Sequence, residues 1–413
     1  MRNADVIVIG GGAAGIAASV SAAESGLKVI LIERYGFLGG LATAAMVGTI
    51  CGLYYRGGET PKFAVRGFAQ SFAEGVARRS GTQAQCFAEG LHFLPYEPLA
   101  FEKEAAEVLH QAGVEILLST VLDDLKIENS NIQKIAASTH DGKITIQTNA
   151  VVDCTGDALV SNLAGLELIE EQIYQSGAFV FRVVGFPAMQ SYTLGLNLLR
   201  WIKKGIHAQR LHPDCDRLSI VPGTLRQGTA FMKLGMPFAS EQNTKTEFEY
   251  EHLARSRAVE IIQFLKETDV SLKSLSITSM ATQVGIRFGQ RSVGQIILNE
   301  TDVLECKKPL DGVAIGAWPV EYWGKERLPE MKYFDANDHY EIPAGALVSS
   351  ELENLFFAGR GLSATEYAIA SARVIGTCLG TGFAAGMLAA SQVKQGAWKN
   401  AIEPIRKKQI GKP

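Results

Sequence analysis

The chain begins with two short apolar runs separated by an alanine-rich stretch. Asp5–Ile9 and Lys28–Ile32 are apolar-rich runs of the length typical of buried strands. Between them, Gly11–Ser25 predicts a helix, and Gly26 is placed to end it. A strand, a helix and a strand in this order predict a βαβ unit at the start of the chain.

The pattern then changes twice before the chain ends. After a helix and a strand, residues 120–154 show short alternating strands separated by turn residues, which predicts a β-meander. Residues of about 170–330 mix strand and helix patterns, and a strand and a long helix return near the end. The predicted elements are helices at Pro98–Gln111, Tyr192–Gly205, Tyr250–Thr268 and within Glu366–Val393, strands at Val114–Ser119, Ala150–Asp153, Ala178–Val184 and Asn354–Ala358, and a surface loop at Ser240–Thr246.

This order predicts an α/β protein in which one domain interrupts another. A chain of 413 residues exceeds the size of most single cores, so two domains are expected. We expect residues 1–170 and 336–413 to form a Rossmann-like domain with a parallel sheet and a β-meander. Residues 171–335 would form an inserted mixed α+β substrate domain.

Composition excludes several classes of function. The formal net charge is −3 and the basic residues are scattered, so no nucleic-acid partner is expected. The apolar run Ala368–Ala390 contains Arg373, which argues against a membrane span, and the N-terminus lacks the pattern of a signal peptide. We therefore expect a cytoplasmic protein. The six cysteines are widely spaced without a CxxC pair, so neither a metal site nor a redox dithiol is predicted.

The first strand runs into the sequence Gly10-Gly11-Gly12-Ala13-Ala14-Gly15. Gly10 permits a tight turn, Gly12 lets a pyrophosphate approach the backbone, and Gly15 lets the helix pack on the strand. Glu33 ends the second strand, 18 residues after Gly15, where a carboxylate accepts hydrogen bonds from ribose hydroxyls. The motif in this context predicts a dinucleotide site at the start of the helix, where the positive helix end attracts phosphates.

Two later strands that break at glycine favour FAD over NAD, namely 151–157 and 355–361. The set GGGAAG, ERYGFLGGLAT, CTGD, GIRFGQRSVGQ, YEIPAGAL and LFFAGRGLSATEYAIASARVIGTCLGTGFAAG resembles the FAD-dependent oxidoreductase family, which has the glutathione-reductase-type FAD fold. The resemblance covers most of the chain in order, except about 185–275.

The resemblance implies a set of FAD contacts. On the ADP side they are Gly10, Gly12, Ala13, Ala14, Gly15 and Glu33, and on the loop after Glu33 they are Arg34, Gly39, Gly40 and Thr43. On the adenosine side they are Gly156 and Asp157, and on the pyrophosphate, ribityl and flavin side they are Gly359, Arg360, Ser363 and Thr377. One departure is Glu366, which stands where the family often has a histidine. It either caps a helix or replaces that histidine as a base.

Substrate-side candidates are fewer. Arg287 is expected to anchor a substrate carboxylate and His339 to accept the proton, with Glu366 as the other candidate base. Arg291 is an alternative anion ligand, and an interdomain salt bridge is the other interpretation of either arginine. Four aromatic residues are candidates either for the pocket or for the core, namely Tyr54, Tyr55, Trp318 and Trp323.

The sequence therefore predicts a flavoenzyme that transfers hydride between a small molecule (an alcohol, sugar, amine or C–C bond) and non-covalent FAD. O2 or an electron carrier would reoxidise the flavin. No histidine lies between Thr43 and Thr60 to tether the flavin, and no second GxGxxG suggests an NAD(P)H domain. The alternatives are a flavin monooxygenase reduced by NAD(P)H, a reductase of an activated C=C bond, and a non-catalytic binding protein that resembles GDP-dissociation inhibitors.

Overall fold

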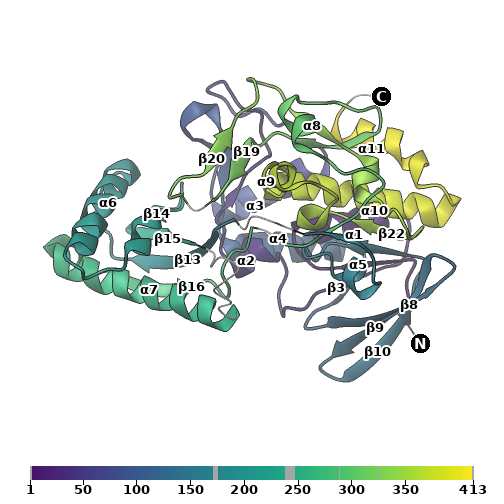
Figure 1. Cartoon of the computed structure of the whole chain (residues 1–413), viewed down its shortest axis with the longest axis horizontal. Helices are drawn as coiled ribbons and strands as arrows, with labels where there is room; N and C mark the ends of the chain where they lie inside the picture. Colours follow the sequence, from purple (N-terminus) through teal and green to yellow (C-terminus); the bar gives the residue numbers. More distant parts are fainter. Residues whose placement is uncertain (1, 171–174, 238–246, 288, 325, 412–413) are drawn as a thin grey trace.

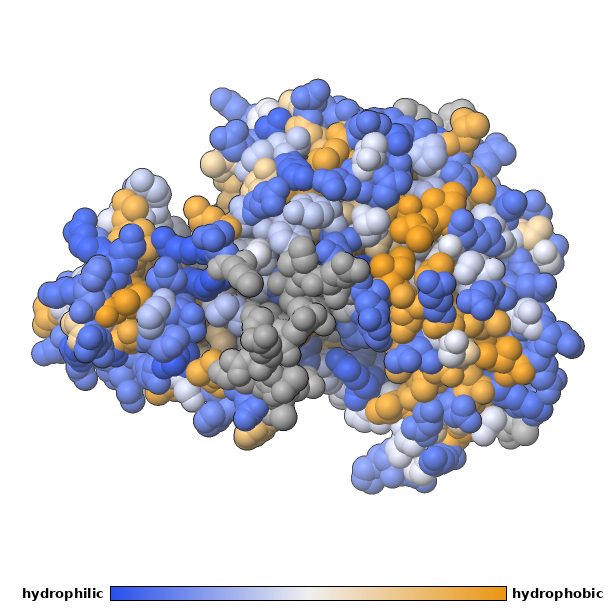
Figure 2. Space-filling view, viewed as in Figure 1, coloured by the Kyte–Doolittle hydropathy of each residue, from blue (hydrophilic) through white to orange (hydrophobic). Residues whose placement is uncertain are grey.

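The structure is a computed structural model that describes residues 2–170, 175–237, 247–287, 289–324 and 326–411. The predicted loop Ser240–Thr246 lies outside the described residues. Two bodies of different size are joined side by side, with the inserted segment forming the smaller one (Figure 1). In the same view, apolar residues gather on the face of the larger body, whereas polar residues prevail over the smaller one (Figure 2).

A five-stranded parallel sheet forms the centre of the larger body. Its strands are, in order, β22 (Leu355–Phe357), β11 (Ala150–Asp153), β2 (Val6–Ile9), β3 (Val29–Ile32) and β7 (Glu115–Leu117). Val6 and Val8 of β2 pack into one core and Ile7 and Ile9 into another, because successive side chains of a strand point to opposite faces. A strand buried on both faces needs the continuous apolar run that the sequence provides. This confirms the predicted α/β class.

Two helices pack closely on one face of this sheet. Helix α1 (Ala13–Glu24) follows β2 directly, and α10 (Ile375–Gln395) lies against it. Glycines on α10 permit this approach: a Cβ at Gly382 would lie 2.0 Å from the carbonyl oxygen of Ala14. The C-terminal segment therefore completes the layer that begins at the N-terminus, as Figure 1 shows.

The predicted long C-terminal helix is instead two helices. Helix α9 (Glu366–Ala372) ends at Arg373, Val374 is extended, and α10 then starts in a new direction, at 96° to α9. The break places Arg373 and Val374 on the wall of a cavity. Within the described residues, no single helix is long and apolar enough to cross a membrane, and this bent pair is the one combination that meets the length and composition criteria.

The meander has three strands, β8 (Val121–Glu128), β9 (Asn131–Thr139) and β10 (Gly142–Gln147), paired antiparallel. β1 (Arg2–Asn3) pairs with β10 in parallel. The expected last strand of the meander, β11, belongs to the parallel sheet, because its apolar side chains are buried on both faces.

The smaller body has its own sheet and core. β14 (Leu218–Ile220), β15 (Thr229–Met236), β13 (Gly177–Val184) and β16 (Ser276–Met280) pair antiparallel in that order. Helices α6 (Ser191–His207) and α7 (Glu247–Thr268) join this core, which gathers apolar residues mainly from 179–284. Apolar residues between 298 and 334 pack in the core of the larger body that also contains Val6 and Val8, although the predicted inserted domain runs to 335. The division into domains stays a prediction.

Short elements complete the chain. Within the described residues, four small sheets pair β6 with both β4 and β5, β12 with β17, β18 with β21, and β19 with β20. The remaining elements are helices α2 (Leu41–Ala44), α3 (Phe68–Ser80), α4 (Pro98–Gln111), α5 (Leu159–Leu163), α8 (Glu300–Leu304) and α11 (Ile402–Gln409), and strands β4 (Thr49–Ile50), β5 (Gln85–Cys86), β6 (His92–Pro95), β12 (Leu168–Ile169), β17 (Arg291–Ser292), β18 (Gly312–Gly316), β19 (Val320–Tyr322), β20 (Glu330–Lys332) and β21 (Tyr340–Pro343).

Candidate functional site

A cavity of about 1440 Å³ runs between the two bodies. Its wall combines the turn before α1, the loop after β3, the end of β11, strand β15, the segment 283–287, β19 and the start of α10. Small-molecule and cofactor sites usually measure about 300–1,000 Å³. The cavity therefore has room for a dinucleotide together with a second small molecule.

The glycine-rich turn forms one end of this cavity. Gly10 has a φ of +99°, which favours glycine, and a Cβ at Gly15 would lie 1.8 Å from the carbonyl oxygen of Gly10. Gly12 borders the cavity, and the nearest atom to a Cβ there would be Gly40 Cα at 3.9 Å. Gly10 and Gly15 are thus required by the fold, whereas the missing side chain of Gly12 leaves space in the cavity. Ala13 and Ala14 line the same wall.

Glu33 lines the cavity near this turn and is buried, with 4% of its surface exposed. Its Oε2 accepts a hydrogen bond from the Gly11 amide at 2.6 Å, and its Oε1 accepts one from the Tyr35 amide at 2.8 Å. Burial raises the pKa of Glu33, and these two amide donors act against that rise. The carboxylate therefore fixes the loop as well as facing the cavity.

Arg360 lines the cavity and connects separate parts of the chain. Its Nε donates to the Gly156 carbonyl oxygen at 2.9 Å, and its Nη2 pairs with Asp157 Oδ1 at 2.8 Å. A further hydrogen bond joins Arg360 to the Ile286 carbonyl oxygen. Three segments distant in the sequence are thus held together at this wall, which Gly359 also lines.

The other predicted FAD contacts divide into two groups. Arg34, Gly39 and Gly40 line the cavity. Thr43, Ser363 and Thr377 are not among its described lining residues, and Thr43 Oγ1 donates to the carbonyl oxygen of Leu38 at 2.8 Å. The start of α10 reaches the cavity through Val374 and Ile375 instead of Thr377.

The structure separates the three predicted catalytic residues. Arg287 lines the cavity, whereas His339 and Glu366 are not among the described lining residues. His339 is buried beside Glu341, with 3.8 Å between Nε2 and Oε1, and Glu341 pairs with Arg406 of α11. Glu366 is the first residue of α9, a position where a carboxylate is favourable. The expectation that His339 and Arg287 share one side of the cleft does not agree with this geometry.

The remaining substrate-side candidates also separate. Trp318 and Trp323 line the cavity, whereas Tyr54 and Tyr55 do not appear among the described lining residues. Arg291 is buried, and its Nε donates to the Ala364 carbonyl oxygen at 2.8 Å. This contact is with the protein backbone, and Arg291 is not among the described residues that line the cavity.

A carboxylate that the sequence analysis missed organises this end of the cavity. Glu321 accepts hydrogen bonds from both indoles, Trp318 Nε1 to Oε2 and Trp323 Nε1 to Oε1, each at 2.8 Å. Arg373 Nη2 donates to the Glu321 carbonyl oxygen at 3.2 Å. Burial opposes the charge of Glu321, but Arg373 and the Trp318 indole hold its pKa below the usual value.

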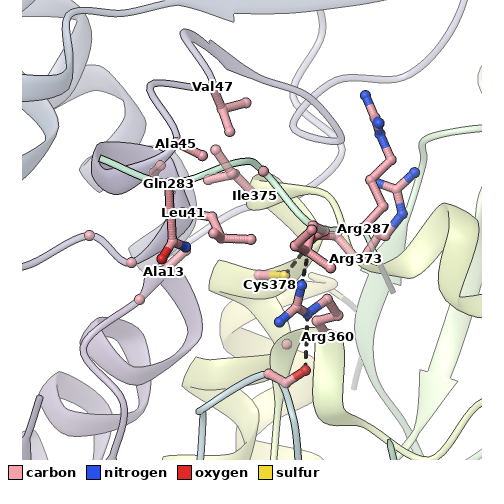
Figure 3. Close-up of a pocket in the computed structure, with 18 of the residues that line it drawn as sticks. Ala13, Leu41, Ala45, Val47, Gln283, Arg287, Arg360, Arg373, Ile375 and Cys378 are labelled. Atoms are coloured by element: carbon pink, nitrogen blue, oxygen red, sulfur yellow. Dashed lines mark hydrogen bonds between the residues drawn. The ribbon is translucent and has the colours of Figure 1, made fainter. Parts of the chain in front are cut away.

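Two further cations lie beside Trp323. Lys233 Nζ is 4.9 Å and Arg287 Cζ is 4.7 Å from the centroid of the indole ring. Burial, with the nearby Arg287, lowers the pKa of Lys233 to about 8, and burial with Arg373 lowers the pKa of Arg287 to about 10. Figure 3 shows Arg287 and Arg373 side by side, with Arg360 nearer Cys378. This end of the cavity, which we term the cation cluster (Lys233, Arg287 and Arg373), attracts anions.

The sequence pointed to two members of this cluster, and one of them, Arg287, was expected to anchor a substrate carboxylate. Arg373 interrupts the apolar run Ala368–Ala390, and a charged residue within a buried segment is often functional. Lys233 and Glu321 gave no such signal, because a polar residue that alternates with apolar ones in a strand looks like one that faces solvent.

Comparisons with known proteins agree with this geometry. Residues 5–409 match the family model described as FAD dependent oxidoreductase. Thiamine thiazole synthase of Aeropyrum pernix is 30% identical over 169 residues, which cover 38% of this chain and 56% of that protein. Digeranylgeranylglycerophospholipid reductase of Methanocella arvoryzae is 29% identical over 166 residues, which cover 39% and 42%. The chain thus spans little more than half the length of the first of these relatives.

Solved structures resemble the whole chain at low sequence identity. The flavin-dependent brominase Bmp2 aligns with a TM-score of 0.52 and 12% identity, covering 98% of this chain and 83% of that one. BexE, described as acting in oxidation during BE-7585A biosynthesis, aligns with a TM-score of 0.50 and 12% identity, covering 95% and 63%. At this identity the likeness shows a shared fold and no shared substrate.

Proposed function

Because this chain belongs to the FAD-dependent oxidoreductase family, we propose that it oxidises a small anionic molecule by hydride transfer to non-covalently bound FAD. The family binds FAD, and the cavity fits it: Gly12 leaves space beside the start of α1, and Glu33 and Arg360 line the same wall. FAD supplies a two-electron acceptor when bound. The chain's own residues bind, orient and select the substrate.

The observation that carries the proposal is the position of Arg287. It lies in the cavity that holds the predicted FAD contacts, and it stacks on Trp323 beside Lys233. A planar guanidinium suits a carboxylate, which it binds through two parallel hydrogen bonds. Arg287 already donates one hydrogen bond to the Ser176 carbonyl oxygen, which fixes the side chain towards the cavity wall. This pre-positioned cation supports an anionic group on the substrate.

The reaction we propose removes hydride from a carbon that carries a hydroxyl or amino group. The proton of that group passes to water, so that a carbonyl or an imine forms. Trp323 and Trp318 supply flat apolar surface against which the substrate carbon chain packs, and Glu321 fixes both rings. O2 or an electron carrier then accepts the electrons from the reduced enzyme.

Anaerobic mixing of the holoenzyme with a matched substrate panel tests this proposal. The panel pairs 2-hydroxy acids and amino acids with the corresponding amides, and loss of the visible flavin absorbance reports reduction. We expect only the acids to bleach the flavin. Arg287→Met should raise the acid concentration needed by about 10- to 100-fold, since a charge-assisted hydrogen bond contributes about 1.5–3 kcal/mol. Arg200→Met, on the exposed side of α6, is the control.

Two results would contradict the proposal. Equal bleaching by acids and amides would remove the anionic group from the substrate. Bleaching by NADPH alone, followed in air by insertion of oxygen into an added substrate, would identify a monooxygenase instead.

A further inference from the structure

We propose that the substrate is a dianion, with Arg287 binding one anionic group and Lys233 the other. This inference rests on the proposed function and adds to it the number of charges and the residue that recognises the second one. It follows from how the charges of the cation cluster are shared within the cavity.

Glu321, the carboxylate beside the cation cluster, already has hydrogen-bond partners. Both oxygens of Glu321 accept indole hydrogen bonds, and Arg373 contacts the backbone oxygen of the same residue. Neither Arg287 nor Lys233 forms an ion pair within 4 Å with a carboxylate of the described residues. With Arg373 balancing Glu321, two positive charges remain in the cation cluster, those of Lys233 and Arg287. Charges withdrawn from water are costly unless they are paired, so this site favours a ligand with two negative charges.

The spacing of the two cations limits the size of that ligand. Lys233 Nζ and Arg287 Cζ each lie within 5 Å of the Trp323 ring centroid, so they are less than 10 Å apart. When contacts of about 2.8 Å lie along the line between the two cations, they leave about 4 Å or less between the two anionic groups. A short dicarboxylate spans this distance, with its carbon chain along the Trp323 ring.

Binding of the second anionic group should depend on pH, because Lys233 changes its charge between pH 7 and pH 9. Burial and Arg287 lower the pKa of Lys233 to about 8, while Glu321 and the Cys51 thiol act in the opposite direction. The neighbouring strands place the uncharged residues Val180 and Ser219 opposite Lys233. Lys233 is therefore mostly cationic at pH 7 and mostly neutral at pH 9. The pKa of Arg287, at about 10, keeps this arginine largely charged at both values.

Isothermal titration calorimetry of the FAD-loaded enzyme with succinate, glutarate and butyrate tests the inference without knowledge of the natural substrate. At pH 7 we expect a dicarboxylate to bind at least 10-fold more tightly than butyrate, and at pH 9 we expect this ratio to approach one. Lys233→Met should give a ratio near one at both pH values. Lys233→Arg should retain the ratio at both, because arginine stays charged. Lys203→Met, on the exposed side of α6, is the control.

The outcomes separate this inference from the proposed function. Equal affinities of butyrate and the dicarboxylates in the wild type, with binding still lost in Arg287→Met, would overturn the dianion and leave the proposed function standing. Binding unaffected by Arg287→Met would overturn both. No detectable binding of either dicarboxylate at pH 7 would also overturn the dianion. If Lys233→Met is purified without FAD, the comparison of wild type with Lys233→Arg at the two pH values decides.

Discussion

Gly12 and Gly15 lie three residues apart, yet their replacement by alanine should have opposite effects on the protein without FAD. A Cβ at Gly15 would lie 1.8 Å from the carbonyl oxygen of Gly10, so the backbone must move. At Gly12 the nearest atom to a Cβ would be 3.9 Å away, and φ and ψ of −75° and −175° suit alanine. Gly12→Ala should therefore leave the apoprotein unchanged or up to about 1 kcal/mol more stable, since alanine restricts the unfolded chain.

Binding of FAD should reverse this advantage for Gly12→Ala. The added methyl group enters space that we expect the pyrophosphate to approach, and overpacking typically costs about 1–3 kcal/mol. The dissociation constant for FAD should rise by about 5- to 150-fold, since each 1.4 kcal/mol corresponds to a factor of ten. With free FAD at 100 times the wild-type dissociation constant, the ligand adds about 2.7 kcal/mol of stability, and a tenfold weaker site removes about half of it.

Two measurements on each variant check this reasoning. Thermal unfolding of the apoprotein reports the fold, and quenching of FAD fluorescence during titration reports affinity. Gly15→Ala is the comparison, and its apoprotein should unfold at a lower temperature because the clash is with backbone. An apoprotein of Gly12→Ala destabilised as much as that of Gly15→Ala would show that Gly12 is a packing residue. Unchanged FAD affinity in Gly12→Ala would show that the cofactor does not approach this turn.

Two further predictions concern residues whose roles the structure redefines. Glu33→Ala should lower both FAD affinity and apoprotein stability, because the Gly11 and Tyr35 amides lose their acceptor and a buried unsatisfied group costs about 1–3 kcal/mol. Glu33→Gln keeps one acceptor oxygen, so its affinity and stability should fall less. A Glu33→Ala apoprotein that unfolds at the wild-type temperature would contradict the structural role of Glu33. His339→Gln should change the anaerobic rate of flavin reduction by less than about threefold, since His339 is buried beside Glu341 and is not among the described lining residues of the cavity. A drop of about 10²- to 10⁴-fold, as for loss of a general base, would show that His339 is a catalytic residue.

Local sequence was sufficient wherever the structure depends on neighbouring residues. The run Val6–Ile9 is apolar at every position, so it has to be a strand buried on both faces, and the glycines that follow allow the turn and the close packing of α1. Glu33 ends the next strand, and parallel pairing of β2 with β3 brings it to the same turn. Fold class and cofactor were therefore predictable from motifs, and the glycine turn and Glu33 line one cavity.

The tertiary structure alone decided how the cation cluster and Glu321 are arranged at one end of the cavity. Lys233, Arg287, Glu321 and Arg373 come from different elements and meet only because the two bodies pack around one cavity. The break between α9 and α10, which brings Arg373 to the cavity, is hidden in an apolar run that reads as one continuous helix. His339 shows the opposite error, since its sequence position suggested the cavity but the structure buries the residue beside Glu341 of β21 and against the Tyr55 ring. Motifs report spacing along the chain, whereas a substrate pocket depends on which distant side chains packing brings together.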